Sequence, residues 1–248
     1  MNAVIKSLYH RQSVRAFQST PIPEALREEL FRCAAAAPTA GNQQLYTILD
    51  ITEEALKQKL AVSCDNQSFI ATAPMVLVFL ADGTRWERSY RLAGAEPREP
   101  GPGDVLLAIA DACIAAQNVV IAAESMGLGS CYIGDILEQC ELHRELLGFP
   151  EYCMPACMLV LGYPDKEKLP AHKPPRFDTE YFVCQNRYRV LPDEALVQMY
   201  EKRAKSNGAT VIKPFNDYMQ AFCTRKYNSD FSREMNRSAG VYLRKFMK

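Results

Sequence analysis

The sequence predicts an α+β fold, in which helices cover a central sheet. Two short and continuous apolar runs, Met75 to Ala81 and Met158 to Tyr163, are typical of strands buried on both faces. The helical segments around them do not follow the regular strand–helix alternation of a doubly wound sheet. With 248 residues, of which 48% are hydrophobic and 23% charged, the chain is long enough for one full core or for a domain with an appendage.

The first half of the chain combines helix-start signals with proline stops. Pro21 and Pro23 open a helix that Pro38 ends, and the loop at 38–44 is rich in small and amide residues. The segment from Arg85 to Asp104 is charged and contains three prolines, so we expect a mobile excursion there. Helices are expected over 2–9, 24–37 and 52–63, and strands over 45–51 and 75–81.

The second half contains the longest expected helix, which Asp104 caps and which runs through Met126 to a glycine-rich end. The composition of the sequence changes after Pro192, where it becomes amphipathic and charged. We therefore divide the chain into a core at 1–190 and a C-terminal helical extension at 191–248, which packs on the core or on a partner subunit. The other expected elements are a short strand or turn at 131–134, helices at 136–147 and 193–205, a strand at 158–163 and a basic loop at 165–190.

Composition excludes several classes of partner. Lysine plus arginine equals aspartate plus glutamate at 29 each, so no global field favours nucleic acid or a membrane surface. The apolar stretch from Val105 to Ala123 is interrupted by Asp111 and indicates a buried core helix rather than a membrane span. The nine scattered cysteines and the absence of an apolar leader predict reduced thiols in the cytoplasm, used as small buried hydrophobes.

Standard catalytic sets are missing from the sequence. The histidines are His10, His143 and His172, and no HExxH, GxSxG, P-loop or strand-linked GxGxxG motif occurs. Metal-ligand spacing is absent as well. A hydrolase with a nucleophile–histidine pair, a metal centre and a Rossmann dinucleotide site are all poorly supported.

Two pairs of cations suit a phosphate group. Arg11 and Arg15 flank Ser13 and would lie on one face if this turn stays helical, while Lys173 and Arg176 bracket two stiffening prolines. Taken alone, each pair is as well explained by a solvated basic turn or loop.

Both pairs of cations belong to a set of five motifs that follow one another along the chain. On these five motifs, the chain resembles the FMN-dependent nitroreductase family. Its larger members, the oxygen-insensitive nitroreductases and the NADPH–flavin oxidoreductases, are the most similar. The resemblance covers roughly residues 5–190 and implies a three-layer α/β/α sandwich with a mainly antiparallel mixed sheet. The motifs are residues 11–15; residues 37–44; Asn66-Gln67 with 69–70 and 73–74; 127–129 running to 132–134; and 173–176 before Asn186 and Tyr188.

The resemblance also implies which residues hold FMN. Arg11 and Ser13 would contact the phosphate region, and Arg15 the pyrimidine edge or the ribityl chain. Either Asn66 or Gln67 would bind the pyrimidine edge. Backbone amides of residues 132–134 would face the flavin ring, which a glycine lets approach closely. The full implied set is Arg11, Gln12, Ser13, Arg15, Pro38, Thr39, Asn42, Asn66, Gln67, Tyr132, Ile133, Gly134, Lys173 and Arg176, with Pro38, Thr39 and Asn42 coming from the other subunit.

The implied activity is an NAD(P)H oxidoreductase that needs no catalytic side chain, because FMN carries the redox step. It would reduce small electron-poor acceptors such as nitroaromatics, quinones or flavins in a ping-pong cycle, as a homodimer with FMN at the subunit interface. Three alternatives stay open: a flavin-destroying or dehalogenating enzyme of the same fold, an FMN-binding redox protein without turnover, and an α+β domain whose arginines are only surface charge.

Overall fold

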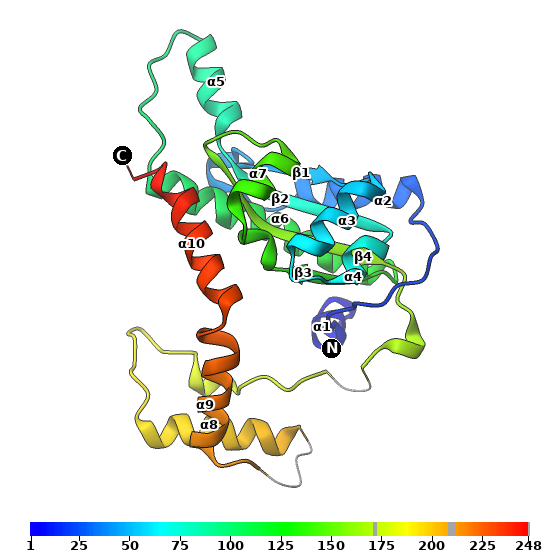
Figure 1. Cartoon of the computed structure of the whole chain (residues 1–248), viewed down its shortest axis with the longest axis vertical. Helices are drawn as coiled ribbons and strands as arrows, with labels where there is room; N and C mark the ends of the chain where they lie inside the picture. Colours follow the sequence, from blue (N-terminus) through cyan, green and yellow to red (C-terminus); the bar gives the residue numbers. More distant parts are fainter. Residues whose placement is uncertain (171–172, 208–211, 248) are drawn as a thin grey trace. The chain divides into compact units, whose positions relative to one another are not determined.

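The computed structural model describes residues 1–170, 173–207 and 212–247. It divides into two compact units, the first formed by Met1–Leu169 with Arg233–Lys248 and the second by Pro170–Ser232. The first unit contains the sheet and is drawn in Figure 1 with the labels used below.

The sheet of the first unit has the strand order β1-β2-β4-β3, with every neighbouring pair antiparallel. The strands are β1 (Tyr46–Asp50), β2 (Met75–Asp82), β3 (Gly129–Ile133) and β4 (Cys153–Gly162). An isolated parallel bridge between Ser13 and Ser130 adds the N-terminal segment beside β3. The predicted α+β class and mainly antiparallel sheet are confirmed.

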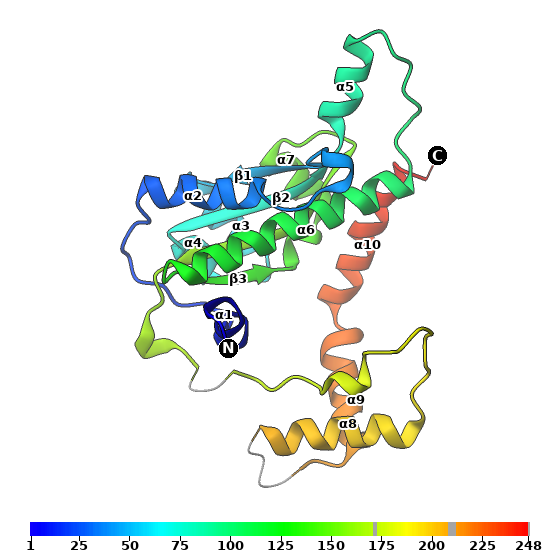
Figure 2. The ribbon, with the colours of Figure 1, turned by 180° about the vertical axis from the view of Figure 1, so that it is seen from behind.

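Strand β2 is buried along its whole length, and its side chains alternate between two core layers. Val76 and Val78 face a cluster with α3 (Glu54–Ser63), α4 (Ser68–Thr72) and α7 (Cys140–Leu147). Leu77 and Phe79 face α2 (Glu24–Ala35) and α6 (Pro102–Ser125) on the other side. Figures 1 and 2 show the sheet between these two helical layers, which is the expected sandwich.

Helix α6 is the one described helix that is long and apolar enough to cross a membrane by length and composition. It packs instead along all four strands, and Ala112, Ala116 and Val120 on its inner face are fully buried. Figure 2 shows it lying across the sheet beside α2. Helix α6 is therefore a buried core helix, as predicted from the polar residues that interrupt its apolar sequence.

Several boundaries differ from expectation. The supposed excursion begins with helix α5 (Thr84–Leu92), whose Arg91 pairs with Glu87 one turn earlier. Helix α6 begins at Pro102, and Asp104 reaches back to accept from the Gly101 amide at 2.7 Å rather than standing at the cap itself. A 3-10 turn over Asp135–Leu137 precedes α7, so the helix expected from residue 136 starts later.

Strand β4 starts five residues before the expected Met158. Pro155 is tolerated within it, because β3 pairs with β4 only from Met158 to Gly162 and leaves the earlier residues without a ladder on that side. A register shift between Phe79 and Leu80 lies opposite this stretch.

Helices complete both units. The first unit also holds α1 (Ala3–His10) and most of α10 (Asp230–Arg244), from which Tyr242 enters the core beside α7. The second unit contains α8 (Asp193–Ser206), α9 (Phe215–Phe222) and a π-helical turn at Cys223–Tyr227. The rings of Tyr200 and Tyr218 pack there at a tilt, with their centroids 4.5 Å apart. The predicted division of the chain near residue 190 stays a prediction.

Candidate cofactor site

The segment after α1 is fastened to the free edge of β3. The amide of Val14 donates to the carbonyl oxygen of Ser130 at 2.9 Å, next to the bridge between Ser13 and Ser130. This approach depends on Gly129, because a Cβ there would lie 2.5 Å from Cγ2 of Val14. The 11–15 motif is thereby held along one strand.

Arg11 and Arg15 lie close to this strand. Burial raises the pKa of the Cys131 thiol, while Arg15, a hydrogen bond from Ser13, and Arg11 act against the rise. Within the described ranges 1–170, 173–207 and 212–247, neither arginine forms an ion pair with a carboxylate. Gln12, half-buried, lies between them. The β3 edge therefore carries two cations that no carboxylate of the described residues neutralises.

The end of β3 is open toward this edge. Ser130 directs its carbonyl outward, so Tyr132, two residues later in the strand, directs its own backbone groups the same way. Gly134 has an ordinary φ of −80°, and a Cβ on it would meet no heavy atom within 4 Å. Neither backbone strain nor a close neighbour among the described residues requires a glycine at this position. A planar ligand packed against the backbone would require one, because a Cβ would hold it away.

Residues Asn66 and Gln67 reach the same strand end. The Gln67 amide nitrogen donates to Asp135 at 3.0 Å and to the Cys64 carbonyl at 2.9 Å, so only its oxygen stays available. Asn66 is exposed in the left-handed conformation with φ 54°. Together with residues 11–15 and 132–134, they form what we call the β3 edge site.

The loop at 38–44 is built around a buried carboxylate that the sequence showed only as an interruption of an apolar run. Asp111 on α6 accepts from the Thr39 hydroxyl, the Ala40 amide at 3.0 Å and the Leu45 amide at 3.2 Å. The loop leads into β1, which is at the opposite edge of the sheet from β3. Pro38, Thr39 and the exposed Asn42 thus lie apart from the β3 edge site of the same chain.

Lys173 and Arg176 belong to the second compact unit, where Arg176 is exposed. Their implied part in phosphate binding stays a prediction. Among the described residues, no group of three or more histidine, cysteine or acidic side chains is arranged to hold a metal ion.

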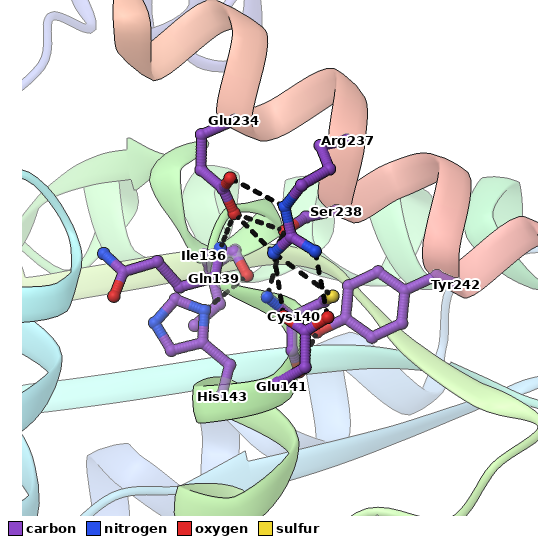
Figure 3. A network of polar contacts seen from close by, with 9 residues as sticks. All are labelled: Ile136, Gln139, Cys140, Glu141, His143, Glu234, Arg237, Ser238 and Tyr242. Atoms are coloured by element: carbon purple, nitrogen blue, oxygen red, sulfur yellow. Dashed lines mark hydrogen bonds and ion pairs between the residues drawn. The ribbon is translucent and has the colours of Figure 1, made fainter.

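A second polar cluster, which we call the α7–α10 junction, was not anticipated (Figure 3). Glu234 accepts from the Gln139 amide at 3.0 Å and from Arg237 and Ser238 at 2.8 Å each, and Ser238 accepts from the Cys140 amide at 3.0 Å. These contacts cap the start of α7 from a distant part of the chain. Arg237 also binds Glu141 at 2.8 Å, and these pairings hold the pKa of Glu141 well below its usual range and lower that of Glu234 to about 2.

His143 lies beneath this junction and is fully buried. Its Nδ1 lies 3.0 Å from the Ile136 carbonyl oxygen and its Nε2 lies 2.8 Å from the Ser63 hydroxyl, and burial lowers its pKa. A neutral imidazole that donates at one nitrogen and accepts at the other satisfies both contacts. His143 therefore serves to tie α7 to Ile136 and to α3.

Comparison with known proteins shows which family the chain resembles. The model of the nitroreductase family matches residues 8–163. A curated Cr(VI) reductase of Pseudomonas sp. strain G-1 is 33% identical over 193 residues, which cover 78% of each chain. The oxygen-insensitive NADPH nitroreductase of Salmonella typhimurium is 33% identical over 207 residues, covering 82% of this chain and 81% of the relative.

A solved structure supports the same placement. The NADPH:FMN oxidoreductase from Vibrio harveyi, complexed with NAD+, matches with a TM-score of 0.78 and 25% identity, over 96% of this chain and 98% of that one. The family match spans well over half of the sequence and includes both the 11–15 segment and the end of β3. The chain belongs to the nitroreductase family.

Proposed function

We propose that the chain binds FMN at the β3 edge site and uses NAD(P)H to reduce small electron-poor molecules, among them nitroaromatics, quinones and flavins. The observation that carries the proposal is the pair Arg11 and Arg15, fastened beside the open end of β3 without a carboxylate partner in the described part of the chain. The names of the relatives, an NADPH nitroreductase and an NADPH:FMN oxidoreductase, support the donor and the cofactor.

The residues present fit a phosphorylated flavin. Arg11 and Ser13 would bind the phosphate, since guanidinium groups bind phosphate oxygens through paired charge-assisted hydrogen bonds. The outward backbone of Tyr132 and the open space at Gly134 would receive one edge of the ring. FMN would supply the hydride and electron transfer when bound, so these residues need only bind it, orient it and donate hydrogen bonds.

A homodimer would complete the site. The loop with Pro38, Thr39 and Asn42 is at the sheet edge opposite β3, so it would reach the flavin from the partner chain. Apolar side chains left on the surface support an interface: Leu106 and Leu107 of α6 are 64% and 52% exposed, and no residue of the largely apolar α1 is buried.

The test is reduction of the purified protein in a stopped-flow instrument. We expect yellow protein that releases FMN on heating and whose flavin absorbance bleaches with NADPH or NADH and returns with a nitroaromatic acceptor. Colourless protein that FMN cannot reconstitute would contradict the binding proposal. Flavin that neither nicotinamide bleaches would contradict the reductase activity and favour a redox protein without turnover.

A further inference from the structure

Gln67 is held both by its backbone and by its side chain. Its backbone N–H donates to the Ala61 carbonyl of α3 at 2.9 Å, and its carbonyl accepts from the Ile70 amide of α4 at 3.0 Å. Its side-chain Nε2 donates to the Cys64 carbonyl at 2.9 Å and to a carboxylate oxygen of Asp135 at 3.0 Å. Both hydrogens of the side-chain amide are thereby used.

These partners fix the orientation of the Gln67 amide. A backbone carbonyl and a carboxylate only accept hydrogen bonds, so the amide nitrogen must lie toward them and the amide oxygen on the other side. The Cys64 carbonyl alone would leave one N–H free for another acceptor. Asp135 takes that second N–H, and it thereby makes Gln67 a pure acceptor toward a ligand at the end of β3.

Asp135 follows directly after Gly134, where the backbone of the β3 edge site is open. It begins the 3-10 turn before α7, and its carbonyl accepts from the Glu138 amide at 3.0 Å, which holds its backbone in place. Within the described residues, no lysine or arginine forms an ion pair with it. The β3 edge site thus combines the cations Arg11 and Arg15 with a carboxylate just past the end of the strand.

The chemistry of the proposed cofactor matches an acceptor at this place. The ring of oxidised FMN carries a single N–H group, on N3 of its pyrimidine edge, and its other heteroatoms there only accept. A side chain that only accepts would therefore bind this N–H and repel the carbonyl oxygens beside it. Gln67 fixed by Asp135 would select one placement of the pyrimidine edge.

We propose that Asp135 is a positioning residue for the flavin, which fixes Gln67 as the acceptor of the ring N–H and whose charge disfavours the reduced ring. The inference rests on the proposed binding of FMN. NAD(P)H would deliver a hydride, that is two electrons and one proton, and leave as NAD(P)+, and the reduced ring then carries one negative charge. A carboxylate in the same site raises the free energy of that anion relative to oxidised FMN, so bound FMN is the stronger reductant.

The first test is the two-electron reduction potential of FMN bound to Asp135→Asn, measured against a dye of known potential. Asparagine keeps an oxygen for the Gln67 amide and removes the charge. We expect the ratio of the affinities for reduced and oxidised FMN to rise about tenfold, which raises the potential by about 30 mV. Glu145→Gln, which removes an exposed carboxylate of α7, should leave the potential unchanged. A potential equal to or below that of the parent protein would overturn the proposal.

The second test isolates the hydrogen bond to Gln67 by equilibrium binding of FMN and of 3-methyl-FMN, in which a methyl group replaces the ring N–H hydrogen. We expect the parent protein and Asp135→Asn to bind the methylated flavin about tenfold more weakly than FMN. In Asp135→Ala the Gln67 amide is free to turn, so this preference should shrink to about threefold or less. A preference as large in Asp135→Ala as in the parent protein would overturn the positioning role.

These measurements separate the role of Asp135 from the reductase proposal, because neither depends on turnover. A parent protein that binds no FMN would contradict the proposed function and this inference together. A parent protein that binds FMN, with Asp135 variants that match it in potential and in flavin preference, would overturn the role of Asp135 alone. Bound flavin that neither nicotinamide reduces would contradict the reductase activity and leave both measurements possible.

Discussion

Arginines lie both at the β3 edge site and at the α7–α10 junction, but their surroundings differ. Arg237 at the junction is bound by Glu141 and Glu234, and every polar group that Figure 3 joins has a partner in the chain. Arg11 and Arg15 have no carboxylate partner among the described residues and stand beside open backbone. A cluster whose charges are paired within the protein stabilises the fold. A cluster with cations that no carboxylate pairs is suited to bind an anionic ligand.

The largest stability effect is expected at the junction, from Ser238→Ala. Ser238 is fully buried, accepts from the Cys140 amide and donates to Glu234, so its removal leaves the start of α7 without one cap. We expect the free energy of unfolding to fall by about 1–3 kcal/mol. FMN affinity should be unchanged in the folded variant.

Urea titration monitored by circular dichroism measures this loss. Ser125→Ala is the matched control, because Ser125 is exposed and its hydroxyl donates to the Ala122 carbonyl of its own helix. A Ser238 variant as stable as this control would contradict the structural role of the junction.

A smaller and pH-dependent effect is expected from Glu138→Gln. Glu138 is buried near Asp135, Asp65 and Glu234, and its Oε1 has no hydrogen-bond partner among the residues that the structure describes. Burial raises the pKa of Glu138 from 4.5 to about 7. A carboxyl whose pKa is raised by folding stabilises the fold while protonated, and this contribution is lost as pH rises from about 4.5 through 7. Glutamine cannot ionise, so it should protect the protein above neutrality.

Unfolding titrations of both proteins at about pH 5 and about pH 8 test this sign. The advantage of the glutamine variant should be larger at the higher pH. An equal difference at both values would mean that Glu138 does not titrate in this range.

The same contrast explains what the sequence could predict. Continuous apolar runs located strand β2 and the second half of β4. The ordered motifs identified segments 11–15, 66–67 and 132–134, which the structure brings to one strand end. The α7–α10 junction could not be predicted from the sequence. Glu234 and Ser238 contact Gln139 and Cys140 across about a hundred residues, and no local sequence pattern marks these contacts. Asp111 did leave a signal, as a lone acid on the inner face of an apolar helix, but its partners in the 38–44 loop are set by tertiary structure.

The measurement that tests the central claim most directly is equilibrium binding of FMN and of riboflavin, which lacks the phosphate, to the flavin-free protein. If Arg11 binds the phosphate, FMN should bind more tightly than riboflavin, and Arg11→Ala should weaken FMN binding by about 1.5–3 kcal/mol while leaving riboflavin binding unchanged. Arg88→Ala removes an exposed arginine of α5 and should change neither affinity. Equal affinities for the two flavins, or an Arg11 variant that binds FMN like the parent protein, would contradict the account.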